Sequence, residues 1–435
     1  MFKINNISYE NVALATLVFS ISFTIFAPAV HYIGYSLILL ILIYGRIKYK
    51  TPFLCFPDKN CRNVSFILLL FFLWSAFANL IYMSDLELWG KGASVYLEML
   101  IGYLFAVRLL CTERSRKAFI SFFIPATVFI FIMILVKDQL PPQMLPKRLT
   151  MNGNTLGLYA VMAFPYVFFY SMWVLRNKIF LKYAGCIVVL LTAFISFSSG
   201  AWLSIAFMLP FFLYFAAVNK KINIKSVIVA MVLCITVLFG INVLSHGGVF
   251  DRFKIEKNQI LAVNNMDSLT NHRYTIWRIV SGLVLKNPIV GYGRGSLEQE
   301  YARALPQYPD VVRDNNVIHG HAHNMYMELA FSGGLPSAIF FIMAFILLLI
   351  STWRARDATE NGVPWNLMLF VLLAGQLVYG LTGDVFEARR DIAVIFWTSL
   401  GIASVLPKSC LSYENRISSP KDKNTQPKEE AENIL

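Results

Sequence analysis

The stretch at residues 64–83 is VSFILLLFFLWSAFANLIYM, twenty residues without a charged side chain. A helix of this length rises about 30 Å, which is roughly the thickness of the hydrocarbon core of a bilayer. Further apolar windows lie at about 11–28, 30–45, 92–111, 118–136, 155–175, 181–198, 200–218, 226–244, 334–353, 365–383 and 392–407. We therefore predict an all-α polytopic membrane protein with about twelve transmembrane helices.

The composition of the whole chain agrees with this prediction. Of its 435 residues, 57% are hydrophobic and 14% are charged, whereas an ordinary soluble domain carries roughly 25% charged residues. These values exclude a soluble enzyme, a disordered protein and a disulfide-rich scaffold. The net charge of +13 fits a membrane topology better than nucleic-acid binding, because the basic residues are distributed unevenly between the predicted loops.

The basic residues also predict the orientation in the membrane. One alternate set of short loops carries 17 Lys and Arg residues and the opposite set carries 6. By the positive-inside rule the first set is cytoplasmic, and so are both termini. We expect four regions: transmembrane helices 1–9 in 1–244, a long periplasmic loop with short helices in 245–323, transmembrane helices 10–12 in 324–407, and a polar, disordered cytoplasmic tail in 408–435.

The long loop ends in the sequence HGHAHN at residues 319–324, and it contains five of the six histidines of the chain. Three histidines at alternating positions share one face of an extended segment. Three interpretations are open: a metal ligand set, solvated loop histidines, or a general base that takes a proton from a sugar hydroxyl near neutral pH.

A second group of residues lies in the same loop. Residues 273–285 have the spacing of an amphipathic helix, with Ile276, Ile279, Val280, Leu283 and Val284 on one side. Arg273 and Trp277 are one turn apart on a common face. A guanidinium that donates two hydrogen bonds suits a pyrophosphate, although an interfacial helix whose arginines bind lipid headgroups has the same pattern.

Other charged residues are weaker candidates. Residues 382–391 place Arg389 and Arg390 in a predicted outer loop, and Arg148 lies in another. Such loops are commonly only solvated, but these arginines could face the same outer cavity as the long loop. Glu98 lies inside a predicted span, where a carboxylate normally faces protein or water.

Several of these motifs together resemble the superfamily of O-antigen ligases and O-antigen polymerases. His323-Asn324 is followed after nine residues by Gly334, and Arg273, Trp277 and the segment NPIVGYG at 287–293 match the helix and turn of the family loop. Asn154, in the sequence NTLG at 154–157, matches a residue that many members of the superfamily have at the start of a span. The resemblance covers roughly residues 148–405. Ser199 stands where the family has an arginine, so either another cation substitutes or the donor is held differently.

The resemblance implies an inverting, metal-independent glycosyltransferase without a cofactor in the bacterial inner membrane, with its active site on the periplasmic side. The donor would be a polysaccharide on undecaprenyl pyrophosphate and the acceptor a hydroxyl of lipid A–core, with membrane lipid around the protein and no nucleic acid bound. We expect His323 to be the general base and Arg273 to stabilise the leaving pyrophosphate. The further substrate contacts that we expect are Asn324, His321, Trp277, Arg278, Arg148, Asn154, Arg389 and Arg390.

Three alternatives remain. An O-antigen polymerase would use the same donor, but the segment from Gly380 to Arg389 is more similar to the corresponding region of ligases. A protein O-oligosaccharyltransferase of the same superfamily is a further possibility. A transporter would need more polar residues within the spans than Glu98 and Gln376.

Overall fold

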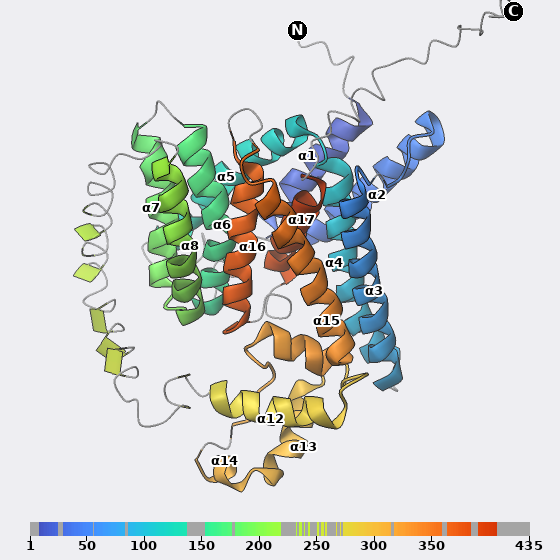
Figure 1. Ribbon diagram of the computed structural model, residues 1–435, viewed down its shortest axis with the longest axis vertical. Coiled ribbons are helices and arrows are strands. Elements are labelled where there is room, and N and C mark those ends of the chain that lie inside the picture. Colours follow the sequence, from blue (N-terminus) through green and yellow to red (C-terminus); the bar gives the residue numbers. More distant parts are fainter. Residues whose placement is uncertain are drawn as a thin grey trace, which may run out of the picture.

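The computed structural model describes residues 8–24, 29–54, 56–82, 86–136, 153–175, 179–218, 273–314, 317–358, 363–383 and 390–406, with isolated positions between 232 and 270. Every element among them is a helix (Figure 1). The helices are α1 (Tyr9–Phe23), α2 (Ala29–Tyr49), α3 (Lys59–Tyr82), α4 (Leu86–Leu109), α5 (Glu113–Val136), α6 (Gly153–Trp173), α7 (Ile179–Ile195), α8 (Ser199–Val218), α12 (Arg273–Lys286), α13 (Leu297–Ala304), η4 (Leu305–Gln307), α14 (Pro309–Asp314), α15 (Met325–Arg354), α16 (Trp365–Gly380) and α17 (Arg390–Val405).

Seven of these helices are long and apolar enough to span a membrane: α2, α3, α4, α5, α6, α8 and α15. Four shorter apolar helices, α1, α7, α16 and α17, coincide with other predicted windows. A helix satisfies its own backbone hydrogen bonds, which lipid requires of any spanning segment. The protein is therefore an all-helical, multi-pass membrane protein. The predicted tail at 408–435 lies outside the described residues, and so does the predicted window at 226–244 apart from isolated positions. Twelve spans therefore remain a prediction.

Helix α6 lies at the centre of one half of the bundle. It packs against α5, α7, α8 and α16, and 94% of its spanning window is buried. In the other half, α3 packs on α15 and α4 packs on α17. Peripheral α2 instead exposes large apolar side chains such as Ile33, Leu40 and Ile47. An exposed apolar face of this kind is what a lipid-facing helix requires, because lipid tails are as apolar as leucine.

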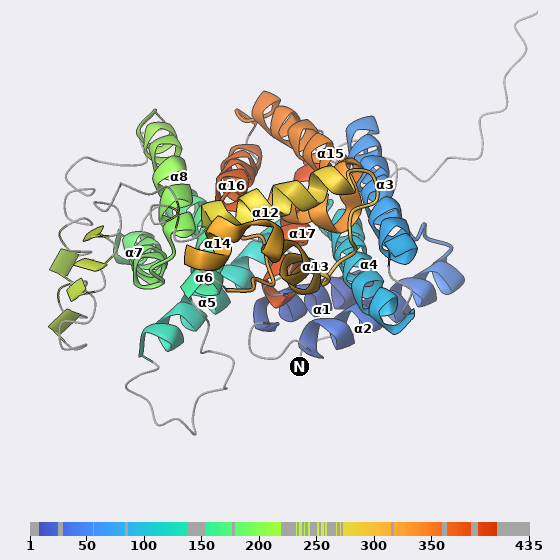
Figure 2. The same ribbon diagram turned by 90° about the horizontal axis from the view of Figure 1, so that it is seen from below.

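The three helices α12, α13 and α14 lie beyond one end of the bundle, at the bottom of Figure 1. Seen from below, α12 runs across the ends of the longer helices (Figure 2). Its buried residues include Ile276, Ile279, Val280, Leu283 and Val284, so the apolar face predicted from the sequence is confirmed. These helices occupy the chain between α8 and α15, where the sequence predicts a long periplasmic loop; the side of the membrane stays a prediction.

Helix α15 is broken at Gly333 and Gly334, where the backbone leaves the helical conformation. A break leaves carbonyl groups without their intrahelical partners, and neighbouring segments supply donors for them. The backbone N–H groups of Tyr292 and Gly293 donate to Phe331 O at 2.8 Å and Ser332 O at 3.0 Å. Trp74 of α3 donates its indole N–H to Gly333 O at 2.8 Å.

Two glycines permit this close approach of backbone to backbone. Gly291 and Gly334 both have φ of +71°. A Cβ on Gly291 would collide with Phe331 O, and a Cβ on Gly334 would collide with Ile289 O. Only glycine adopts this conformation without a steric penalty. The NPIVGYG turn is thus a docking segment for the broken helix, and it holds the part of α15 before the break against α12.

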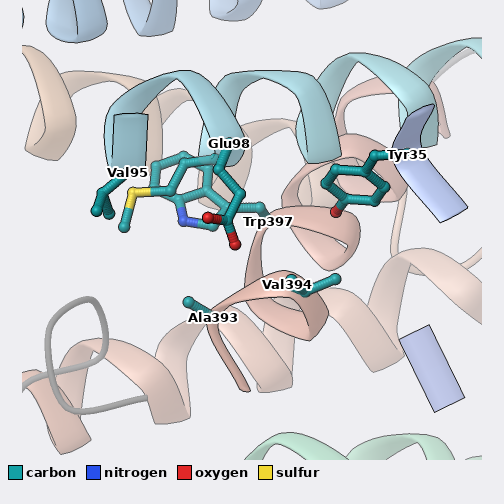
Figure 3. A pocket seen from close by; sticks show the side chains of 7 residues that line it. Tyr35, Val95, Glu98, Ala393, Val394 and Trp397 are labelled. Atoms are coloured by element: carbon teal, nitrogen blue, oxygen red, sulfur yellow. The ribbon is translucent and has the colours of Figure 1, made fainter. Parts of the chain in front are cut away.

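Glu98, which the sequence leaves without a partner inside a span, is paired. Nε2 of His31, on α2, lies 2.7 Å from Glu98 Oε1, and His31 Nδ1 lies 2.8 Å from Thr24 Oγ1. Figure 3 shows the Glu98 carboxylate beside a small cavity that Tyr35 and Trp397 also line. The carboxylate therefore faces protein, as expected of an acid at membrane depth, and it ties the α1–α2 hairpin to α4.

Candidate active site

The N-terminal turn of α12 lies against the loop that carries the histidines. Trp277 donates its indole N–H to Ala322 O at 3.1 Å, and Arg273, one turn earlier, is only 9% exposed. Helix α12 packs on α15 through its apolar stripe. Because this stripe is buried, the rotation of α12 about its own axis is fixed, and Trp277 and Arg273 lie at the histidine loop.

Ala322, the residue before His323, is held from both sides. Its carbonyl accepts from Trp277, and its N–H donates to Glu328 Oε2 at 2.7 Å. Ala322 is fully buried and Glu328 is 3% exposed, so neither hydrogen bond competes freely with water. A buried carboxylate that accepts a backbone N–H makes a strong, charge-assisted contact. From the sequence, Glu328 is only a carboxylate near the histidines. That it accepts a hydrogen bond from the Ala322 backbone is visible only in the folded structure.

His323 itself has φ of +49°, the left-handed region that costs a residue with a Cβ about 1–2 kcal/mol. The next residue, Asn324, is extended and caps α15. Its Oδ1 accepts from the N–H groups of Tyr326 at 3.0 Å and Met327 at 3.1 Å, and its Nδ2 donates to Leu381 O at 3.2 Å. Both polar atoms of the Asn324 amide thus have partners within the protein, and its direct contact with substrate stays a prediction.

The electrostatic surroundings of His323 keep its ring neutral. Burial of the imidazole, then the positive charge of Arg273, and then His321 and His319 lower the pKa of His323 to about 4. Arg273 is therefore near enough for its charge to act on the ring. At neutral pH a group with this pKa is almost entirely unprotonated, so one ring nitrogen is available as a proton acceptor.

The three alternating histidines have different surroundings. His321 is exposed, and its ring lies 6.5 Å from that of His323. His319 packs edge-on against buried Tyr301 at 5.6 Å. Among the described residues, no group of three His, Cys, Asp or Glu side chains is arranged to hold a metal ion.

Arg278 lies five residues beyond Arg273, on another face of α12, and is engaged elsewhere. Its guanidinium forms a two-pronged ion pair with Asp310 of α14 and lies over the ring of Tyr308 at 5.4 Å. The hydrogen bond from Arg278 lowers the pKa of the Asp310 carboxyl. This pair ties α12 to α14, and a contact between Arg278 and substrate remains a prediction.

The C-terminal end of α16 joins the histidine loop to the start of α6. Tyr326 donates its hydroxyl to Leu377 O at 2.8 Å, and Tyr379 donates its hydroxyl to Asn154 O at 2.9 Å. Asn154 is exposed at the first turn of α6. It therefore lies in the same end of the bundle as Asn324, with α16 between them.

The position of the family arginine lies in this neighbourhood. Ser199 begins α8 and is exposed, and Gly200 next to it packs so closely on Thr382 that a Cβ would collide with Oγ1. Arg148 and Arg389 lie outside the described residues. Arg390 begins α17, and its side chain also lies outside the description.

The O-antigen ligase family matches residues 184–342 of the chain. The matched segment contains α8, α12, the histidine loop and the break in α15, so the resemblance seen in the sequence motifs is confirmed there. No curated protein matches the chain. The family match supports a glycosyltransferase-like enzyme of the O-antigen ligase and polymerase type, acting in lipopolysaccharide-related biosynthesis.

Proposed function

We propose that this protein is an O-antigen ligase, which moves a polysaccharide from undecaprenyl pyrophosphate to a hydroxyl of lipid A–core. The observation that carries this proposal is the hydrogen bond from Trp277 to Ala322, which joins the first turn of α12, where Arg273 lies, to the residue before His323. Within the segment that matches the O-antigen ligase family, Arg273 is mostly buried, and its charge is the second cause of the lowered pKa of His323. This pair supplies a proton acceptor and a stabilising cation at one place.

In the proposed reaction, the acceptor hydroxyl oxygen attacks the anomeric carbon of the donor and His323 takes the hydroxyl proton. The bond between that carbon and the pyrophosphate oxygen breaks, and its electron pair leaves with the pyrophosphate. Arg273 offsets the charge that grows on this leaving group. Attack opposite the leaving group inverts the anomeric configuration. Pyrophosphate departs as an anion, so the reaction requires no general acid.

The low pKa of His323 fits an enzyme that is activated by its donor. Efficient general bases have pKa values near the working pH, whereas His323 in the unliganded chain has a pKa of about 4. A pyrophosphate bound to Arg273 would offset the positive charge that is the second cause of this shift. The pKa of His323 would then rise toward its ordinary value of about 6.5, and the base would gain strength only when the donor is in place.

The hydrogen bonds around His323 support its use as a fixed base. Trp277 and Glu328 hold Ala322 before it, and Asn324 anchors the start of α15 after it. A catalytic group has to be positioned to within a fraction of an ångström, because misplacement by about 1 Å can cost about a hundredfold in rate. We assign positioning roles to these three residues.

The test is a lipopolysaccharide gel from a strain that lacks the gene and carries variant copies. We expect His323→Ala to abolish capping of lipid A–core while lipid-linked polymer accumulates and the protein stays in the membrane. Lys286→Gln is a matched control, since Lys286 is an exposed cation at the far end of α12. Capping by the His323→Ala variant would remove the general-base role. Capping with single repeats in the deletion strain would identify a polymerase instead.

A further inference from the structure

A groove lies between α1 and α5. It has a volume of about 570 Å³, which is within the usual range for small-molecule sites. Asn11, Ala15 and Phe19 line it from α1, and Arg114, Ala118 and Phe122 line it from the start of α5. On each helix these residues are four apart, so each set forms one continuous ridge.

The groove is polar at one end and apolar at the other. Asn11 lies at the start of α1, and Arg114 and Ser115 lie in the first turn of α5, which the hydroxyl-bearing Thr112 directly precedes. Two turns further along, the lining consists of Phe19 and Phe122, and the centroid of the Phe23 ring lies 6.0 Å from that of Phe122. From Arg114 to Phe122 the helix rises about 12 Å.

Arg114 is available to a ligand. It is exposed, and within the part of the chain that the structure describes no hydrogen bond or ion pair engages it. The nearest acid on α1, Glu10, is occupied by Arg108, whose Nη2 lies 2.5 Å from Glu10 Oε1. Arg116, in contrast, is buried and donates to the carbonyls of Leu110 and Cys111. Arg114 therefore brings to the polar end of the groove a positive charge that no ion pair among the described residues neutralises, and the nearest acid along α5 is Glu113, which precedes it.

We propose that this groove is a binding site for one anionic phospholipid. Its phosphate lies at Arg114 and the start of α5, where the helix dipole also favours an anion, and an acyl chain lies along Ala15, Ala118 and the phenylalanine rings. The arrangement of one cation above an apolar channel matches a phospholipid in charge and in polarity. The basic residues of this segment belong to the predicted cytoplasmic set, so the lipid comes from the cytoplasmic leaflet.

This site is separate from the one around His323. The groove lies at α1 and the start of α5, whereas Trp277 of α12 contacts the histidine loop. In Figure 1, α1 lies at the top of the bundle and α12 at the bottom. The two sites are therefore at opposite ends of the bundle. This separation argues against the lipid-linked donor as the occupant, because its pyrophosphate would have to reach Arg273.

The experiment is native mass spectrometry of the full-length protein in detergent, titrated with phosphatidylglycerol, phosphatidylethanolamine or undecaprenyl phosphate. We expect one molecule of phosphatidylglycerol to be retained about tenfold more tightly than phosphatidylethanolamine. Arg114→Gln should weaken this binding about tenfold, equivalent to about 1.4 kcal/mol. Lys117→Gln is the matched control, because Lys117 is an exposed cation of the same helix that does not line the groove.

A second variant tests the apolar part. Ala118→Trp fills the groove without changing its charge, and it should also lose the retained phosphatidylglycerol. Retention by Arg114→Gln equal to that of the unmodified protein would overturn the proposal. So would equal losses in Arg114→Gln and Lys117→Gln, or an Arg114-dependent preference for undecaprenyl phosphate over phosphatidylglycerol.

Discussion

The hydrogen bond from Ala322 to Glu328 gives a quantitative test of how His323 is positioned. In Glu328→Ala the N–H of Ala322, a fully buried residue, loses its acceptor at 2.7 Å. An unsatisfied buried donor costs about 1–3 kcal/mol. The cost falls on the conformation that holds His323 at φ of +49°, so the loop can relax away from it. A population shift of this size corresponds to about 5- to 150-fold, and we expect the rate of polysaccharide transfer to fall by that factor.

The conservative variant separates positioning from general damage. Glu328→Gln keeps one oxygen that can accept from Ala322 and replaces the other by an uncharged NH2 group, so it should recover most of the rate. The assay is transfer from lipid-linked polysaccharide to lipid A–core in proteoliposomes, with kcat and KM measured separately. Positioning of the base predicts a loss in kcat with little change in the KM for the donor. An unchanged kcat in Glu328→Ala, with the protein folded in the membrane, would refute this reasoning.

Four further predictions concern the same end of the molecule. Arg273→Gln should reduce transfer by at least about a hundredfold, and Arg273→Lys should recover little because lysine lacks the two-pronged donor geometry; both are measured in the same assay, with Lys286→Gln as the control. The pKa of His323 near 4 predicts that kcat/KM stays level from pH 8 to about 5 and falls near pH 4. The value of kcat should fall at a higher pH, because bound pyrophosphate raises the pKa of His323. Coincident pH profiles of kcat and kcat/KM would contradict this. Since the unfolded chain takes up this proton nearer pH 6.5, the contribution of His323 to stability is present above that pH and declines toward pH 4, as thermal unfolding in detergent can measure. Gly334→Ala should lower the unfolding temperature markedly, because its Cβ would collide with Ile289 O, while Gly295→Ala, which has open space around its Cβ, tests backbone strain alone and should lower it less.

The helices were predictable because their cause is local. A long apolar stretch such as 64–83 has one way to satisfy its backbone in lipid, and α3 follows from that requirement. The buried stripe of α12 was equally predictable, since five apolar residues at helical spacing require a partner surface. The proximity of Arg273 and His323 was expected from a resemblance between sequences, and spacing along the chain alone does not imply it.

The contacts that define the site depend on pairs of residues far apart in the chain. The glycine-rich turn does not indicate a function by itself. Its role is to donate hydrogen bonds to carbonyls at the break in α15, some 40 residues later in the chain. The pairing of Arg278 with Asp310 is likewise tertiary, and a sequence pattern that suits pyrophosphate suits this ion pair equally well. Asn324 is an ordinary helix cap by residue type, and its second bond, to Leu381, depends on how α16 ends.

The interruption at Gly333 and Gly334 has a mechanical consequence. A continuous rod would transmit every change in its tilt to the residues at its end, and spanning helices adjust their tilt when the thickness of the surrounding bilayer varies. Here the segment that follows His323 and Asn324 is bonded at its far end, through the carbonyls of Phe331, Ser332 and Gly333, to the NPIVGYG turn and to Trp74. The lipid-embedded remainder is anchored at its start to the same turn, because Leu335 donates its N–H to Pro288 O at 2.7 Å. A change in its tilt therefore has to bend the helix at this turn before it displaces the imidazole.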